Sequence, residues 1–198
     1  MRSDNPSGAD NQQETAESSV RLTPSWIVGF VDGEGCFSVS IHQQPLMHRH
    51  RGWQIQCAFQ VYQHSDHVGV LEAIRDYFEC GVIRSKGPRS SVLTYSVSRL
   101  RELERVIVPF FEEHHPLVKA RDFGLFAAVV GAMSSGHHLT DDGFERIVRL
   151  AYRMNAHGKQ RRRTLDEVLA GSSETARQAY PFNADMKIQS DPHGDVRS

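Results

Sequence analysis

Two stretches in which apolar and polar residues alternate constrain the fold of this chain more than any other feature. In the first, Phe37, Val39 and Ile41 alternate with polar residues, and in the second the same alternation runs over residues 53–62. A period of two is expected of a β-strand with one buried and one solvated face. The polar loop 43–52 joins the two stretches, so together they predict an antiparallel hairpin.

Helical patterns surround this hairpin. The segment 23–25, Thr-Pro-Ser, is typical of a helix start. After the hairpin, Ser65 is positioned to cap a second helix, and a second hairpin is predicted over residues 82–86 and 93–98. The first half of the chain therefore has the order αββαββ.

Three more helical patterns follow. One covers residues 100–107 and is expected to be broken by Pro109, because proline lacks the backbone N–H that a continuing helix needs. The others cover residues 123–130 and the segment after Thr140, which can act as an N-cap. The whole order predicts an α+β domain, with a twisted antiparallel sheet that has helices on one side and a polar face on the other.

Length and composition set the domain count and the compartment. A chain of 198 residues with 39% hydrophobic residues can build one sizeable core. We expect a domain over 23–170, a disordered arm over 1–22 and a disordered tail over 171–198. No run approaches the roughly 18 apolar residues of a membrane span, so no membrane partner is expected. Three widely spaced cysteines indicate neither a disulfide framework nor a zinc site, and favour an intracellular, reducing compartment, cytoplasm or organelle matrix.

The charge distribution points to a negatively charged partner. The net charge is -1, which by itself argues against nucleic acid. Residues 36–101, however, contain eight Lys or Arg against four Asp or Glu, whereas both ends of the chain are net negative. The neutral total therefore hides a basic centre that contains the predicted strands.

The acidic segment after the first helical pattern is the candidate for chemistry. Gly29 and Gly33 lie four residues apart, so they share one helix face that another backbone can approach closely. Asp32 and Glu34 place two carboxylates at the helix C-terminus, where the macrodipole disfavours anions. A hard divalent cation would offset these charges, since Mg²⁺ takes one or two carboxylates, keeps several waters and can activate one against a phosphate.

The segment IVGFVDGEG, residues 27–35, resembles the signature helix of the LAGLIDADG homing endonucleases. The resemblance extends over about residues 23–154 and includes segments 59–63, 109–123 and 138–143. It implies the αββαββα homing-endonuclease-like fold, whose curved sheet forms a DNA-binding saddle. It also implies double-strand cleavage of a long, roughly palindromic DNA site with 3′ overhangs. The implied cofactor is Mg²⁺, with Mn²⁺ or Ca²⁺ able to substitute for binding.

The resemblance also implies which groups bind metal. Glu34 matches the acid that binds the catalytic metal, with the carbonyl of Gly33 beside it. Asp32 matches the acid that supports the helix ends at a dimer interface. Because Glu34 is one methylene longer than the Asp that often stands at its position, Asp32 remains an alternative ligand.

Three further catalytic positions and a dimer interface follow from the same match. Gln63 matches a residue that orders water around the metals, Lys119 the basic residue near the scissile phosphate, and His67 a second basic position. A single signature helix per chain implies a two-fold homodimer. The residues expected at its interface are Val28, Gly29, Asp32 and Gly33.

Strand parity predicts which side chains read DNA. The apolar residues of each strand face the core, so the polar residues between them face away and would enter the major groove. The expected DNA-contacting residues are Ser38, Ser40, His42, Gln44, Gln54, Gln56, Gln60, Arg84, Lys86, Arg89, Thr94 and Ser96.

Other interpretations compete with these. A glycine-rich helix end with two acids is, alone, more often a simple helix cap. DGEG does not continue as a calcium loop, because Gln43 stands where the twelfth-position Glu belongs. For the whole protein, the main alternative is a non-cleaving nucleic-acid binder on the same fold, an RNA-splicing maturase or a regulator. A protein-interaction module that only dimerises is a second. Carboxylates at a phosphodiester favour the nuclease, because a binder does not need them.

Overall fold

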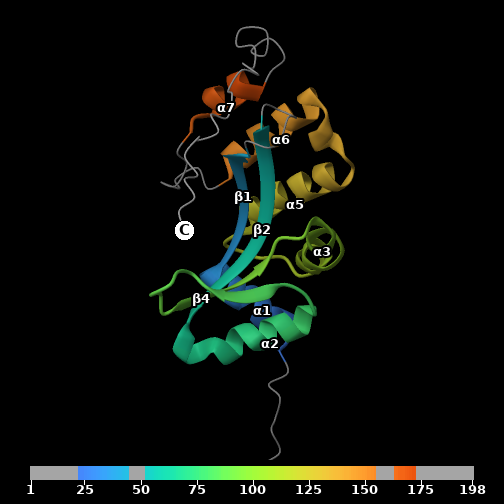
Figure 1. Cartoon of the computed structure of the whole chain (residues 1–198). Helices are drawn as coiled ribbons and strands as arrows, with labels where there is room; N and C mark the ends of the chain where they lie inside the picture. Colours follow the sequence, from blue (N-terminus) through green and yellow to red (C-terminus); the bar gives the residue numbers. More distant parts are fainter. Residues whose placement is uncertain (1–21, 45–51, 155–162, 173–198) are drawn as a thin grey trace, which may run out of the picture.

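A four-stranded antiparallel sheet organises the computed structural model, which describes residues 22–44, 52–154 and 163–172 (Figure 1). The strands are β1 (Gly35–Gln43), β2 (Trp53–His64), β3 (Val82–Ser85) and β4 (Val92–Val97). Their order in the sheet is β1-β2-β4-β3, with every neighbouring pair antiparallel. Both predicted hairpins are present, and the pairing of β2 with β4 joins them, so the predicted α+β class is confirmed.

The strand register confirms the predicted parity. Phe37 lies opposite Phe59, and both side chains are buried. Ser40 lies opposite Gln56, and both are exposed. We call the face that carries Ser40 and Gln56 the outer face. Residues with the same parity start at Cys36 on β1, Gln54 on β2, Val82 on β3 and Val92 on β4.

Helices pack against the inner face and the ends of the sheet. The longer ones are α1 (Pro24–Glu34), α2 (Val68–Phe78), α5 (Ala120–Ser134), α6 (Asp141–Arg153) and α7 (Leu165–Ser172). The shorter ones are η2 (Ser65–His67), α3 (Leu100–Glu102), η3 (Leu103–Ile107), α4 (Val108–Glu113) and η4 (His137–Leu139). Figure 1 shows α1 and α2 beside the end of the sheet where β4 lies, and α5, α6 and α7 towards the far end of β1 and β2.

Aromatic side chains form the centre of the core between sheet and helices. The ring of Phe37 lies 5.4 Å from Phe59 on the neighbouring strand, 5.1 Å from Phe111 of α4 and 5.4 Å from Phe126 of α5, measured between centroids. Stacked and edge-on contacts at these distances are favourable beyond simple burial. The aromatic cluster therefore fixes the inner face of the sheet and leaves the outer face for other contacts.

The helix predicted to be broken by Pro109 instead continues through it. The chain is helical from residue 100 to 113, and residues 103–107 form a π-helical turn. The N–H of Val108 donates to the carbonyl of Leu103, five residues back. The wider turn accommodates proline, which would otherwise clash with a carbonyl of the preceding turn.

Two smaller predictions are corrected. Ser65 does not cap the second helix: the chain enters α2 through η2, and the Nδ1 atom of His64 accepts a hydrogen bond from Asp66 N. The tail boundary predicted at residue 171 falls inside α7, where Gly171 lies directly against the indole of Trp53. Residues 1–21 of the predicted arm 1–22, the loop residues 45–51, residues 155–162 and the tail beyond 172 lie outside the described residues.

Candidate functional site

The C-terminal end of α1 leads directly into β1. The Thr23 hydroxyl accepts a hydrogen bond from Trp26 N at the helix start, and the N–H of Gly35 donates to Val31 O at its end. A Cβ atom on Gly35 would lie 2.6 Å from the side chain of Val31, so this junction requires glycine because of close approach. The tight junction places residues 32–34 at the margin of the sheet.

Asp32 binds the backbone that leads into α5. Its Oδ2 accepts a hydrogen bond from Leu117 N at 2.8 Å, and its Oδ1 accepts one from Lys119 N at 3.1 Å. Burial alone would raise the pKa of Asp32, but backbone hydrogen bonds from residues 117–119 and the charge of Lys119 outweigh it and hold the pKa below its usual value. Both carboxylate oxygens thus have protein partners, and the interpretation of Asp32 as the better metal ligand is not favoured.

Lys119 supplies positive charge at the same helix end. Its Nζ donates a hydrogen bond to the carbonyl oxygen of Asp32. A cation at a helix C-terminus interacts favourably with the macrodipole. The sequence predicts positive charge at this helix end, and Lys119, 87 residues further along the chain than Asp32, supplies part of it.

Glu34 is the exposed acid of the pair. It is the last residue of α1, and its neighbour Gly33 is exposed as well. Within the described residues there is no cluster of three or more His, Cys, Asp or Glu side chains that could hold a metal alone. One open carboxylate with a carbonyl beside it nevertheless fits a hard cation such as Mg²⁺, which takes one or two carboxylates and completes its shell with water and substrate phosphate.

The two other predicted catalytic positions lie near the end of β2. Gln63 is opposite Leu93 and shares the parity of the buried Val61, and its Oε1 accepts a hydrogen bond from His64 N at 2.8 Å. His67 is exposed at the end of η2. In the described part of the chain, no hydrogen bond joins either residue to the acidic end of α1, whereas Asp32 and Lys119 are in direct contact. Gln63 nevertheless lies only two residues beyond Val61, which is opposite Gly35 at the junction of α1 and β1.

Most of the predicted DNA-contacting residues lie on the outer face or beside it. Ser40, His42, Gln44, Gln56, Arg84, Lys86 and Arg89 are exposed, and Ser38, Gln54, Gln60 and Ser96 are partly exposed. Thr94 is the exception: it has outer-face parity between Tyr62 and Arg84, yet it is only 8% exposed. Its neighbours on the adjacent strands leave little of it for a ligand, so Thr94 is a poor candidate for base contact.

Sequence reasoning did not select two residues of the outer face. Cys36 is half-buried opposite Gln60, and burial raises the pKa of its thiol. Tyr62 donates its hydroxyl hydrogen to Gln60 Oε1 at 3.0 Å, and the Lys86 Nζ lies 5.1 Å from its ring centroid. The same strand parity that selected Gln60 places both residues on this face.

The surface of α1 opposite the core combines glycines with aromatic residues. Trp26 is 41% exposed and stacks on Phe30, with 5.0 Å between ring centroids. Gly29 and Gly33 are exposed, and a Cβ atom added to either would meet nothing within 4 Å. These four residues follow a three- and four-residue spacing and form one continuous helix face, here called the α1 glycine face.

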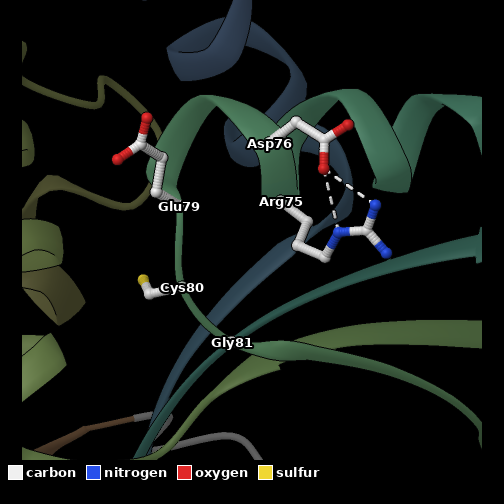
Figure 2. A pocket seen from close by; sticks show the side chains of 5 residues that line it. All are labelled: Arg75, Asp76, Glu79, Cys80 and Gly81. Atoms are coloured by element: carbon white, nitrogen blue, oxygen red, sulfur yellow. Dashed lines mark hydrogen bonds and ion pairs between the residues drawn. The ribbon is translucent and has the colours of Figure 1, made fainter.

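A pocket of about 370 Å³ lies elsewhere, at the junction of α2 and β3 (Figure 2). It is lined by Arg75, Asp76, Glu79, Cys80 and Gly81, and the Arg75 guanidinium is hydrogen-bonded to Asp76. None of the predicted site residues lines it. The candidate chemistry is therefore on the open surface and not in this pocket.

The chain is an α+β protein with an acidic helix end beside a lysine. Within the described residues, this candidate site adjoins the open, polar outer face of the sheet and is not enclosed in a cleft. The comparison with protein families agrees with this fold class and names a particular family. Residues 27–130 match the family model described as LAGLIDADG endonuclease, and the chain belongs to that family.

Curated relatives carry endonuclease names. The chain is 34% identical over 130 residues to the probable intron-encoded endonuclease 2 of Neurospora crassa, with 64% of this chain and 28% of that protein covered. It is 28% identical over 153 residues to the homing endonuclease I-ApeII of Aeropyrum pernix, with 75% and 89% covered. The chain thus spans little more than a quarter of the Neurospora protein and most of the Aeropyrum one.

Solved structures share the fold. The crystal structure of the homing endonuclease I-TnaI has a TM-score of 0.67 and 34% identity, covering 77% of this chain and 99% of that one. The archaeal intron-encoded homing endonuclease I-Vdi141I, solved in complex with DNA, has a TM-score of 0.68 and 30% identity, covering 75% and 92%. The fold predicted from the signature segment is confirmed.

Proposed function

We propose that this chain is a site-specific homing endonuclease that cuts both strands of a long, roughly palindromic DNA site. The observation that carries the proposal is the difference between the two acids at the end of α1. Asp32 is occupied by backbone donors and Lys119, whereas Glu34 is open at the margin of the polar outer face. A protein that only bound DNA would have no need for this open carboxylate.

The proposed reaction is hydrolysis of a phosphodiester on each strand, leaving 3′ overhangs. A water molecule attacks phosphorus and loses a proton to solvent, the bond to the leaving oxygen breaks, and that oxygen takes up a proton from solvent, so the products are a phosphate monoester and a hydroxyl group. Glu34 and the carbonyl of Gly33 would hold Mg²⁺, which when bound lowers the pKa of water and offsets charge on the phosphate. Lys119 adds a fixed positive charge beside the scissile group, and Asp32 keeps the lysine-bearing segment in place.

Gln63 and His67 complete the proposed catalytic set, and neither is proposed to bind the metal directly. Gln63 is expected to order water near the metal, and His67 to add a donor to the phosphate. Both are near the end of β2, and His67 is exposed. Their roles require DNA to bring the scissile phosphate near both this segment and Glu34.

The active form is proposed to be a two-fold homodimer joined through the α1 glycine face. Absent side chains at Gly29 and Gly33 leave room for a second helix backbone, which would cover the exposed Trp26 and the partly buried Phe30 that stacks on it. Leu117 and Val118, on the segment held by Asp32, add exposed apolar surface at the same end of α1. Two copies would then present two outer faces to one palindromic duplex.

The outer face is proposed to lie in the major groove and read base edges. Its Ser, Gln, His, Arg and Lys side chains are the donors and acceptors that major-groove contacts use. Such a partner also implies an intracellular compartment that contains DNA. As for membranes, none of the helices in the described ranges has the length and apolar character needed to cross one.

Replacing Glu34 with Gln tests the proposal directly. The purified chain is incubated with Mg²⁺ and a library of duplex DNA sites, and cut products are sequenced. Glu34→Gln is expected to lower cleavage by more than about a hundredfold while DNA binding persists, because the metal loses its charged ligand.

The matched control is Glu104→Gln, which changes an exposed glutamate in η3 and is expected to cut normally. Cleavage by Glu34→Gln at the wild-type rate would reject the assignment. A wild-type chain that binds DNA tightly and never cuts it under Mg²⁺ would favour the non-cleaving binder.

A further inference from the structure

Three outer-face side chains beside the end of α1 contact one another in a row. The Tyr62 hydroxyl donates to Gln60 Oε1 at 3.0 Å, and the Lys86 ammonium lies 5.1 Å from the Tyr62 ring centroid. Gly35 is opposite Val61, so Tyr62 is level with the junction of α1 and β1. The row is therefore close in the sheet to the acidic helix end that carries Glu34.

Tyr62 determines which atoms Gln60 can offer to a ligand. Gln60 has two amide N–H donors and one oxygen with two lone pairs, and the bond from the tyrosine hydroxyl turns that oxygen towards Tyr62. Burial is the main cause that raises the pKa of Tyr62, and the nearby Cys36 thiol adds to the effect. The Tyr62 hydroxyl therefore keeps its hydrogen at neutral pH. No acceptor for the Gln60 amide nitrogen occurs in the described part of the chain, and Gln60 thus presents donors.

Lys86 extends the same donor surface. Its backbone N–H is fixed to the carbonyl of Val92 at 2.9 Å, and its ammonium is held over the Tyr62 ring by a cation–π contact. Lysine has three donors and no acceptor. Together with the Gln60 amide nitrogen, Lys86 makes this part of the outer face rich in donors, and the acceptors beside them are the second lone pair of the Gln60 oxygen and the Tyr62 hydroxyl oxygen.

A surface with more donors than acceptors favours one purine over the other. In the major groove guanine presents two acceptors, N7 and O6, whereas adenine presents the N7 acceptor beside the N6 amino donor. The usual pairing of glutamine with adenine needs the side-chain oxygen to accept from N6, and here that oxygen is turned towards the Tyr62 hydroxyl and already accepts one hydrogen bond from it. Donors facing the adenine amino group would leave both sides unpaired, which disfavours adenine.

We propose that Tyr62 is a specificity-determining positioning residue that orients Gln60, with Lys86 beside it, to read guanine at one position of each half-site near the cut. This inference rests on the proposed DNA-cleaving function and names the base that this part of the outer face prefers. Tyr62 touches no base itself and acts through Gln60 and Lys86.

The test is a binding selection with the full-length chain on a randomised duplex library, with Ca²⁺ replacing Mg²⁺ so that bound DNA stays intact. Wild type is expected to enrich guanine at one position per half-site. Tyr62→Phe keeps the ring under Lys86 and frees the Gln60 oxygen, so the ratio of adenine to guanine at that position should rise about tenfold. Gln60→Ala should lose the preference at the same position.

Tyr77→Phe is the matched control, because Tyr77 is a partly exposed tyrosine of α2 and its change should leave the profile intact. A Tyr62→Phe profile identical to wild type overturns the inference and leaves the proposed function standing. So does an equal loss of affinity for all sequences, which would make the row a phosphate contact. A wild-type chain that enriches no DNA sequence at all rejects the proposed function together with the inference.

Discussion

At the end of α1, functional groups are held by hydrogen bonds between distant segments, whereas on the outer face they are positioned mainly by strand register. Asp32 binds backbone atoms of residues 117 and 119, more than 80 positions along the chain. Gln56 and Ser40 are positioned simply by being opposite each other in β2 and β1. Changes at the first region should therefore affect both folding and chemistry, and changes at the second should affect recognition alone.

The largest expected effect comes from the acid that holds the α5 segment. Asp32→Ala removes the acceptor for at least two backbone N–H groups and frees the segment that carries Lys119. It should lower the free energy of unfolding by about 1–2 kcal/mol, the usual cost of a lost side-chain cap, and slow cleavage as well. Urea unfolding and single-turnover cleavage measure the two effects separately.

The neighbouring acid supplies the contrast. Glu34→Ala should leave the free energy of unfolding within about 0.5 kcal/mol of wild type, since its carboxylate is exposed.

The contribution of Asp32 to stability also depends on pH. The folded-state pKa of Asp32 is lowered, so its stabilisation is present above the unfolded pKa of about 4 and is lost as pH falls through the folded pKa. The stability gap between wild type and Asp32→Ala should thus shrink below about pH 4, and a gap that widens there would contradict the structural role.

An intermediate effect is expected at the α1 glycine face. Gly29→Leu should convert the proposed dimer to a monomer, because a branched side chain occupies the space needed by a second helix backbone. The monomer itself should fold normally, since a Cβ at this position meets nothing within 4 Å. Light scattering measures the mass.

Gly124→Leu in α5 provides the control. Gly124 is also helical and exposed, with nothing within 4 Å of an added Cβ, so the two substitutions are equivalent within one chain. If both variants keep the mass of a dimer, the interface lies elsewhere. If Gly124→Leu alone dissociates, α5 is the contact.

The smallest effect is expected on the outer face. Gln56→Ala should relax base preference at one position per half-site by about 1–3 kcal/mol, with unchanged unfolding and unchanged cleavage of the remaining good sites. Cleavage profiles over single-base variants of the site give the measurement. Gln43→Ala is the control: Gln43 is also exposed but has inner-face parity at the end of β1, and its profile should match wild type. Profiles of the same shape for wild type and Gln56→Ala would show that this face does not read bases.

Much of the fold follows from short-range patterns. The alternation at Phe37, Val39 and Ile41 predicts both the strand and the face that is buried, because side chains of a strand point alternately to its two sides. The Thr140 side chain caps α6 as its local sequence predicts, accepting a hydrogen bond from Gly143 N. Pro109 shows the limit, because no short-range pattern indicates the π-helical turn over residues 103–107 that precedes it.

The functional site shows the same contrast between short-range patterns and tertiary contacts. The sequence by itself determined that two carboxylates end a glycine-marked helix, and that a polar sheet face accompanies them. Only the tertiary structure decided that Asp32 is the occupied acid and Glu34 the open one, and that Tyr62 joins Gln60 to Lys86. The physical reason is range: periodicity and capping act within a few residues, whereas the partners of Asp32 are 85 and 87 residues away and meet it only when α5 packs against the sheet.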